Sequence, residues 1–393
     1  MKKVVVTHAK RTIIGSFAGV LASFSATELG SLVIKDLLKE SGIEPSVVDE
    51  VIMGNVISSG LGQAPARQAA IYAGLPEKTE ALTINKMCGS GLKAVMLATQ
   101  AIQVGDADVV IAGGMESMSN APYILPKVRQ GLKLGNAQMY DSLILDGLID
   151  VYSNKHMGSC ADKCAKDFSF TREQLDAFAI DSYNKAINAV NKGVFTPEIT
   201  PVVVKSKSGE EVLIKDEEPF RVNFDKLPSL KPAFEKDGVV TAANASSLND
   251  GASALLLMSE EKALELGLTP LVEIVGQSSA AKAPVDFTTA PADAMAKLLK
   301  KLNMTADDID LFEINEAFAV VSLAVNELLK LNPEKVNVHG GAVALGHPIG
   351  ASGARILTTL IYEMQRRNSV YGMASLCIGG GEASALVVKN VRK

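Results

Sequence analysis

Cysteine, long apolar runs and excess positive charge are all scarce in this chain of 393 residues. Four cysteines are too few for a disulfide framework, which favours a reducing compartment. No apolar run is long enough to cross a bilayer, and residues 1–11 return to charged side chains too soon for a signal peptide. The net charge of -5 is unsuited to a nucleic-acid or anionic membrane surface. We therefore expect a cytoplasmic protein with neither nucleic acid nor a membrane as its partner.

The composition is that of a compact folded protein, with 47% hydrophobic and 21% charged residues. Short motifs recur in the same order roughly 260 residues apart, which indicates an internal duplication. In the second copy the last two motifs are almost adjacent, whereas in the first copy a long segment separates them. That segment is therefore interpreted as an insertion. The matching pairs are Leu37 with Leu298, residues 90–93 with 352–355, residues 110–114 with 377–381, and residues 252–255 with 383–386.

The repeat predicts three parts. These are an N-terminal half formed by residues 1–118 and 251–268, an inserted loop domain at residues 119–250, and a C-terminal half at residues 269–393. Each half alternates strand and helix patterns, which predicts an α/β fold with a mostly parallel sheet covered on both faces. Two similar halves should pack about a pseudo-twofold axis. Within the insert, most of the helical pattern lies between residues 171 and 193.

Cys88 lies in a glycine-rich turn between a predicted strand, residues 81–84, and a predicted buried helix, residues 92–104. A thiol at such a turn faces free backbone N–H groups and the positive end of the helix dipole, which favour a thiolate. A buried structural cysteine is the alternative and, for a lone cysteine, the more common one. A set of possible partners near the C-terminus favours a catalytic role instead.

Three more polar or glycine-rich turns lie in the C-terminal half, at residues 315–318, 339–353 and 377–381. By the duplication each should follow a core strand, so all could converge with the Cys88 turn between the halves. His347 stands between a glycine and a proline and therefore belongs on a loop, although a structural hydrogen-bonding role is also open to it. The glycine spacing matches neither a dinucleotide nor a P-loop fingerprint. Two cysteines and a histidine at one site would suit covalent catalysis with a proton-transfer pair.

In their order and separation these four turns resemble those of the thiolase family, and the resemblance covers the whole chain. It implies the family fold, with two duplicated βαβαβαββ halves in a layered αβαβα core and an inserted loop domain. It also implies the family reaction, a reversible Claisen condensation of acyl-CoA. Here the reaction would join two acetyl-CoA into acetoacetyl-CoA and CoA through an acetyl-cysteine. A homotetramer, no metal and no tightly bound cofactor are further implications.

The resemblance also implies catalytic roles. Cys88 would be the nucleophile, and the backbone N–H groups of Cys88 and Gly379 would hold its thioester oxygen. His347 would activate Cys88 and, with a water fixed by Asn315, hold the oxygen of the second acetyl-CoA. Cys377 would take a proton from the methyl group of that second acetyl-CoA.

Contacts to CoA are implied chiefly within the insert. Met157, Phe234 and Phe318 would offer apolar surface to the pantetheine arm, and Arg221 could stack on the adenine or meet a phosphate. Without the family resemblance, we would interpret His156 as a histidine on a loop and Phe234 as part of a small satellite core, with no role in binding CoA. The full set implied by the resemblance is Leu148, His156, Met157, Arg221, Phe234, Ala242, Ser246, Ala317 and Phe318.

Cys160 and Cys164 are spaced for one face of a helix, with only His156 nearby. A zinc site needs more ligands than these three residues supply. We interpret the two cysteines as helix thiols near the CoA loop.

The chain departs from many bacterial biosynthetic thiolases in the loop at residues 283–291. Phe287 replaces a methionine there and the glycines are absent, as in the mitochondrial acetoacetyl-CoA thiolases, some of which accept a 2-methyl branch. The potassium-binding tyrosine of that subgroup corresponds to Pro219, so the resemblance carries no potassium site over. A bulky ring in a short pocket still favours two-carbon transfer.

Three alternatives remain open. A 3-ketoacyl-CoA thiolase of fatty-acid breakdown would share the catalytic set and have a roomier pocket for longer chains. A non-catalytic thiolase-like lipid carrier would be expected to lack Cys88, His347 or Cys377, and all three are present. A decarboxylating or acyl-carrier-protein-dependent condensing enzyme would more often pair its cysteine with two histidines, so Cys377 and Asn315 argue against it.

Overall fold

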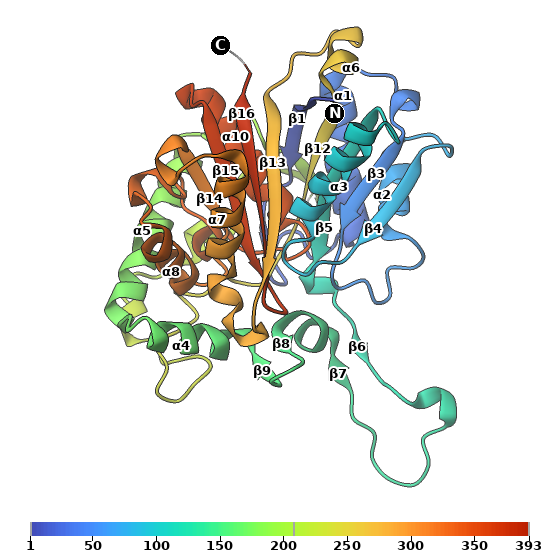
Figure 1. Ribbon diagram of the computed structural model, residues 1–393. Helices are drawn as coiled ribbons and strands as arrows, with labels where there is room; N and C mark the ends of the chain where they lie inside the picture. The colour runs from blue at the N-terminus through green and yellow to red at the C-terminus, as the bar shows by residue number, and fades with distance from the viewer. Residues whose placement is uncertain (1, 207–208, 392–393) are drawn as a thin grey trace.

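The computed structural model describes residues 2–206 and 209–391 (Figure 1). The predicted three-part division also includes residues 1, 207–208 and 392–393, which lie outside the described residues. Within the described ranges no helix combines the length and apolar character needed to cross a membrane.

One continuous sheet forms from two groups of strands that meet at a narrow contact. The first group, in spatial order, is β1 (Val4–Arg11), β12 (Asn249–Ser259), β5 (Val109–Ser117), β3 (Glu50–Gly54) and β4 (Glu80–Ile84). The second is β13 (Val272–Ala281), β16 (Glu382–Asn390), β15 (Tyr371–Ile378) and β14 (Leu311–Ile314), and β1 joins β13 through only Val5↔Glu273 and Val6↔Val272. The two groups therefore act as the sheets of two related halves.

Two helices fill the space between these sheets. They are α3 (Ser90–Val104) and α10 (Ser352–Arg367), which pack against each other and share one apolar core with inward-facing strand residues from both halves. The repeated motifs at residues 90–93 and 352–355 are the first turns of these two helices. The duplication predicted from the sequence is thus seen in the structure as a pair of equivalent central helices.

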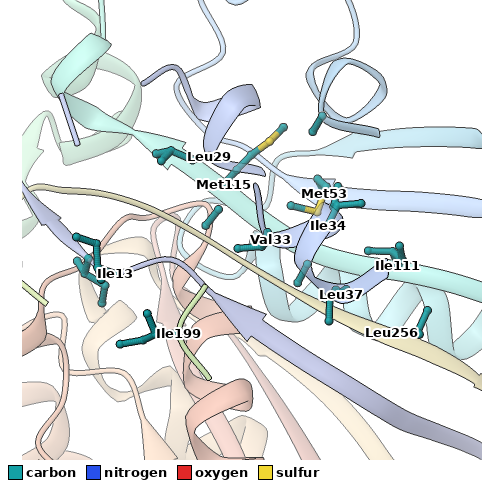
Figure 2. Packing of buried hydrophobic residues seen from close by; sticks show 14 of the residues in the cluster. Ile13, Leu29, Val33, Ile34, Leu37, Met53, Ile111, Met115, Ile199 and Leu256 are labelled. Carbon is teal, nitrogen blue, oxygen red and sulfur yellow. The ribbon is translucent and has the colours of Figure 1, made fainter. Parts of the chain in front are cut away.

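The outer faces of the two sheets carry the remaining pairs of helices. On the N-terminal half, α1 (Ala26–Ser41) begins with a capping box between Ser25 and Glu28 and ends at the left-handed Gly42. Figure 2 shows Leu29, Val33, Ile34 and Leu37 of α1 gathered with sheet residues such as Met53, Ile111 and Met115. The same face of the N-terminal half also carries α2 (Pro65–Tyr72). The outer face of the C-terminal half carries α7 (Ala290–Leu302) and α8 (Ala319–Leu329), and these two outer layers complete the αβαβα architecture.

The expectation of a mostly parallel sheet is wrong. The pairs β3–β4, β3–β5 and β14–β15 are parallel, but the pairs that join them through the centre of the sheet are antiparallel. In the C-terminal half β15 returns as β16 through the short turn 379–381, and a link that short permits only an antiparallel pair. In addition, β14 forms a single parallel bridge from Phe312 to Val336 on the side where its N-terminal counterpart β3 pairs with the full strand β4.

The insert leaves and re-enters the N-terminal half at neighbouring points, because Ser117 at the end of β5 pairs with Asp250 at the start of β12. It contains α4 (Met157–Asp167) and α5 (Arg172–Asn191), and a capping box from Thr171 opens α5 as its sequence predicts. The arm between β6 (Tyr123–Ile124) and β7 (Tyr140–Asp141) extends away from the body (Figure 1). The domain boundaries at residues 118, 250 and 268 stay a prediction.

Several short elements also belong to the two halves. The strand β2 (Gly15–Ser16) pairs with β12. The helix α6 (Glu260–Glu265) follows β12, and the helix α9 (Ala342–Leu345) precedes His347. The remaining short strands all belong to the insert, and they are β8 (Ile149–Asp150), β9 (Lys155–His156), β10 (Val202–Ser206) and β11 (Gly209–Leu213).

Candidate active site

The N-termini of α3 and α10 meet at two glycines that the duplication makes equivalent. A Cβ at Gly91 would lie 2.7 Å from the backbone nitrogen of Ala354, and one at Gly353 would meet the backbone nitrogen of Leu92. Only glycine permits this approach of two backbones. The turn before α3 carries Cys88 and the loop before α10 carries His347, so the close approach brings the two segments together between the halves.

The Cys88 turn is shaped by its own side chains. Ser90 Oγ accepts the N–H of Lys86 at 2.9 Å and donates to the carbonyl of Met87 at 2.6 Å, while Asn85 Oδ1 accepts the N–H of Met87 at 3.0 Å. These bonds hold Met87 in the left-handed region, with φ at 47°. A residue with a side chain is strained there, and such strain is common at functional turns.

The Cys88 thiol faces the turn that follows the second cysteine. The N–H groups of Gly379 and of Cys88 itself lie near its sulfur and act to lower the pKa of the thiol. Lys86 Nζ also forms an ion pair with Glu382, at the far end of the same turn. The nucleophile turn of one half is therefore tied to the Cys377–Gly381 turn of the other.

The expected thiolate is not favoured in the free protein. Burial raises the pKa of the Cys88 thiol to about 11, and this outweighs the two N–H groups that lower it. The helix terminus supplies N–H donors as expected, but folding also removes solvent from around the sulfur. The resting group is a neutral thiol that must lose its proton during attack.

A neutral thiol predicts a specific alkylation profile. Because the pKa of Cys88 is raised to about 11, its thiolate fraction should grow about tenfold per pH unit through the neutral and mildly alkaline range. The rate of iodoacetamide labelling at Cys88, followed by peptide mass spectrometry, should rise accordingly. A plateau reached near neutral pH would show that the sulfur already exists as a thiolate.

His347 lies on the loop after α9, as the Gly-His-Pro setting predicts, and is almost fully buried. Its Nδ1 lies 2.6 Å from Ser352 Oγ, and that hydroxyl donates to the carbonyl of Pro348 at 2.9 Å. A hydroxyl whose hydrogen is engaged can only accept from the ring, so Nδ1 carries the proton and Nε2 is the free base. Burial, with Arg355 adding repulsion, lowers the pKa of His347 to about 3 and keeps the imidazole neutral.

Asn315 directly follows β14 and is fully buried. Its Nδ2 lies 3.4 Å from Nε2 and 3.5 Å from Nδ1 of His347. Its Oδ1 has no hydrogen-bond partner among the described residues. A buried amide oxygen in this state is suited to accept a hydrogen bond from a water or a substrate.

Cys377 is the penultimate residue of β15 rather than part of a turn, and His347 follows a helix. The 377–381 turn therefore follows a core strand as expected, with Cys377 still on that strand, whereas the 339–353 segment follows only the single bridge at Val336. Cys377 is fully buried, and burial together with the neighbouring Cys88 raises the pKa of its thiol well above the usual value. A thiolate formed there is consequently a strong base.

A row of aromatic rings connects the insert with the C-terminal half. His156 stacks on Phe234 with ring centroids 4.7 Å apart, and Phe234 meets Phe318 edge to face at 6.1 Å. Phe318 in turn contacts Phe287 edge to face at 6.4 Å. The structure thus brings together three residues predicted to contact CoA and places Phe287, the departure noted in the sequence, at the end of the same row.

Other predicted CoA residues fall into two groups. Met157 and Ala317 belong to the core around Phe318. Ser246 donates through Oγ to the carbonyl of Ala317 at 2.8 Å. Leu148 and Cys88 both pack against a small apolar cluster that contains Val56. Arg221 is more than half exposed and pairs with Glu217 at 3.7 Å. Ala242 is exposed as well, and no contact described for either residue joins it to the aromatic row.

A cavity of about 510 Å³ opens beside the Cys88 turn. Met87, Met157 and Gly379 line its catalytic side, and Val56 and residues 145–147 and 149–152 form its other walls. This volume can hold a short acyl thioester and part of a pantetheine arm.

The sequence analysis missed Ser352 and Asn249. The side chain of Asn249 accepts the N–H of His347 at 2.8 Å and fixes the loop from β12. Ser352 could have been found, because the repeat makes it equivalent to Ser90, and each serine hydroxyl bonds back to the turn before its helix. Cys160 and Cys164 both lie buried on α4, as their spacing predicts.

Comparisons with known proteins give consistent family matches. A model of the thiolase N-terminal domain matches residues 4–261, and one of the thiolase C-terminal domain matches residues 268–390. An acetyl-CoA acetyltransferase of Cupriavidus necator is 52% identical over 391 residues, covering 99% of this chain and 100% of that protein. A probable acetyl-CoA acetyltransferase of Dictyostelium discoideum is 51% identical over 392 residues, covering 100% of this chain and 95% of the relative.

Two solved structures are also similar. The Bacillus anthracis acetyl-CoA acetyltransferase superposes with a TM-score of 0.97 at 44% identity, covering 100% of this chain and 99% of that one. The Acat5 thiolase of Ascaris suum, solved with coenzyme A, superposes with a TM-score of 0.94 at 47% identity, covering 99% of this chain and 100% of that one. The chain belongs to the thiolase family.

Proposed function

We propose that this chain is an acetyl-CoA C-acetyltransferase, which condenses two acetyl-CoA into acetoacetyl-CoA and CoA and also catalyses the reverse reaction. One observation carries the proposal: α3 and α10 cross at Gly91 and Gly353 and place the Cys88 sulfur within reach of the Gly379 N–H beside Cys377. The relatives named above as acetyl-CoA acetyltransferases support the choice of substrate.

In the first half-reaction Nε2 of His347 takes the Cys88 proton while the sulfur attacks the acetyl carbonyl. The oxyanion is held by the N–H groups of Cys88 and Gly379, and one such donor is typically worth about 3 kcal/mol. As the carbonyl reforms, the CoA sulfur leaves and takes a proton from Cys377. The products are free CoA, an acetylated Cys88, a protonated His347 and a Cys377 thiolate.

In the second half-reaction the Cys377 thiolate removes a proton from the methyl group of a second acetyl-CoA. Nε2–H of His347 and a water held by Asn315 donate to the enolate oxygen that forms. The enolate carbon attacks the acetyl group on Cys88, and the released thiolate recovers its proton from His347. Cys88, His347 and Cys377 are then back in their starting protonation states, because the methyl proton on Cys377 replaces the one that left with CoA.

CoA would lie along the aromatic row, which predicts a binding defect when the row is cut. Phe234→Ala removes the ring between His156 and Phe318, and an aromatic contact contributes roughly 0.5–1.5 kcal/mol beyond its buried area. We expect KM for acetyl-CoA to rise up to about tenfold, with kcat changed much less. Phe24→Ala, in the outer core of the N-terminal half, is the control. An unchanged KM in a folded Phe234→Ala chain would remove this ring from the site.

Arg221 and Ala242 stay within the proposed CoA contacts on the family resemblance alone. No tightly bound cofactor and no metal enters the proposed reaction. The four free thiols support a reducing, cytoplasmic location.

We also propose a homo-oligomer, a tetramer by family resemblance. The arm at residues 123–141 exposes Leu132, Leu134 and Met139, and the outer strand β4 exposes Leu82. Apolar side chains exposed together on a projecting arm suit contact with other copies of the chain. Light scattering of the purified chain should give four times the 41.4 kDa mass of one chain.

The decisive test is mass spectrometry of the tryptic peptide that contains Cys88 after brief incubation with acetyl-CoA. One acetyl group on that peptide, lost when a second acetyl-CoA or CoA is added, is the expected result. Comparing thiolysis of acetoacetyl-CoA with that of a medium-chain 3-ketoacyl-CoA tests the chain length. Faster cleavage of the longer substrate would replace the proposal with a thiolase of fatty-acid breakdown.

A further inference from the structure

Glu116 is a fully buried carboxylate on β5 that the catalytic steps above do not use. Its Oε1 accepts from Asn55 Nδ2 at 2.8 Å and from the N–H of Ile57 at 3.2 Å. Its Oε2 accepts from the N–H groups of Val56 at 3.0 Å and Gly350 at 2.9 Å. One side chain thus binds two separate segments of the chain, residues 55–57 and the loop at Gly350.

Both segments carry parts of the active site. Gly350 lies three residues after His347 on the same loop, and Val56 lines the cavity beside Cys88. The loop fits closely, because a Cβ at Gly350 would lie 2.6 Å from Glu116 Oε2. Glu116 is close enough to Cys88 for its charge to raise the pKa of that thiol.

The groups that bond to Glu116 all donate, so the arrangement is that of a carboxylate, and a proton on either oxygen would displace a donor. Burial raises the pKa of Glu116 to about 7, and the N–H groups of Val56, Ile57 and Gly350 oppose this rise. Asp250 on β12 adds repulsion. A buried charge that is costly in this way is kept in place by its bonds to the two loops.

We propose that Glu116 is a positioning residue for catalysis, which fixes the His347 loop against the cavity wall so that Nε2 stays within reach of the Cys88 sulfur. The inference rests on the proposed function, since it gives Glu116 its effect through the acetylation of Cys88. Glutamine at this position would keep the shape and turn an NH₂ toward N–H donors, so the loop would move away. A displacement of about 1 Å can reduce a rate about 10²-fold.

The test is a double-mutant cycle on the rate of Cys88 acetylation, measured by rapid-quench mass spectrometry. Glu116→Gln should slow acetylation about 10²-fold in the otherwise unchanged chain. In a His347→Ala background, where there is no imidazole to position, it should change the slower rate little. Equal losses in both backgrounds would mean that Glu116 only stabilises the fold, and the proposal would be wrong.

Gly350→Ala is the second variant, because its Cβ perturbs the same contact from the other side without removing the charge. Gly350→Ala should also slow acetylation when His347 is present and change the rate little in the His347→Ala background. It therefore tests the proposal even if the Glu116→Gln chain does not fold. Glu363→Gln is the matched control: it neutralises a buried carboxylate on α10 that pairs with His339 and Arg366, and acetylation should be unchanged.

An unmodified chain that fails to be acetylated refutes the proposed function. An acetylated chain with unimpaired Glu116→Gln and Gly350→Ala variants refutes the Glu116 proposal alone.

Discussion

Cys88→Ala should abolish acetyl transfer. The acetyl group bonds to the Cys88 sulfur, which lies near the Gly379 N–H, and alanine has no nucleophile to replace it. Loss of a nucleophile in a covalent mechanism typically costs at least about 10⁴-fold in kcat. Both acetoacetyl-CoA formation and the acetylated peptide should disappear, which is measured by a coupled CoA-release assay and by mass spectrometry.

The matched control for this variant is Cys160→Ala. Cys160 is a buried thiol on α4, so the substitution removes the same atom from a folded core without touching the nucleophile turn. Its activity should equal that of the unmodified chain. Substantial condensation by a folded Cys88→Ala chain would mean that another group carries the acetyl and that the turn was misassigned.

Cys377→Ala should separate the two half-reactions. Acetylation of Cys88 should persist, because a CoA thiolate can leave without a proton donor at the sulfur. Condensation needs a base at the methyl carbon of the second acetyl-CoA, and a positioned base contributes roughly 10²–10⁴-fold. We therefore expect a stable acetyl-enzyme and acetoacetyl-CoA formation slowed by about that factor.

The experiment measures both steps on the same sample, with peptide mass spectrometry for the first and product absorbance for the second. Cys160→Ala, which removes a buried thiol on α4, should leave both rates unchanged. A Cys377→Ala chain that condenses at the normal rate would exclude this sulfur as the base. A chain that is no longer acetylated would show that the proton from Cys377 is indispensable for the departure of CoA in the first step.

The internal duplication explains why so much of the site could be predicted from the sequence. Motifs that recur in order predict that residues 90–93 and 352–355 are equivalent, and both begin central helices in the structure. Glycines at 91 and 353 are needed where those helices meet. A repeat carries information about contacts between distant segments, which patterns of local hydrophobicity do not.

Other features depended on burial and on long-range hydrogen bonds, which a local pattern does not contain. The donors near Cys88 suggest a thiolate, but desolvation in the folded chain raises its pKa instead. The mixed strand directions follow from where β12 and β16 return into the sheet.

The sequence by itself therefore determined the duplicated α/β architecture, the place of the insert after β5 and the identity of the residues with reactive side chains. The tertiary structure decided the protonation and the orientation of these side chains. It keeps His347 neutral with its proton on Nδ1, buries the thiols and sets the contacts of Glu116. The physical reason is that covalent chemistry belongs to a residue type, whereas the free energy of a charge depends on the atoms that replace water around it.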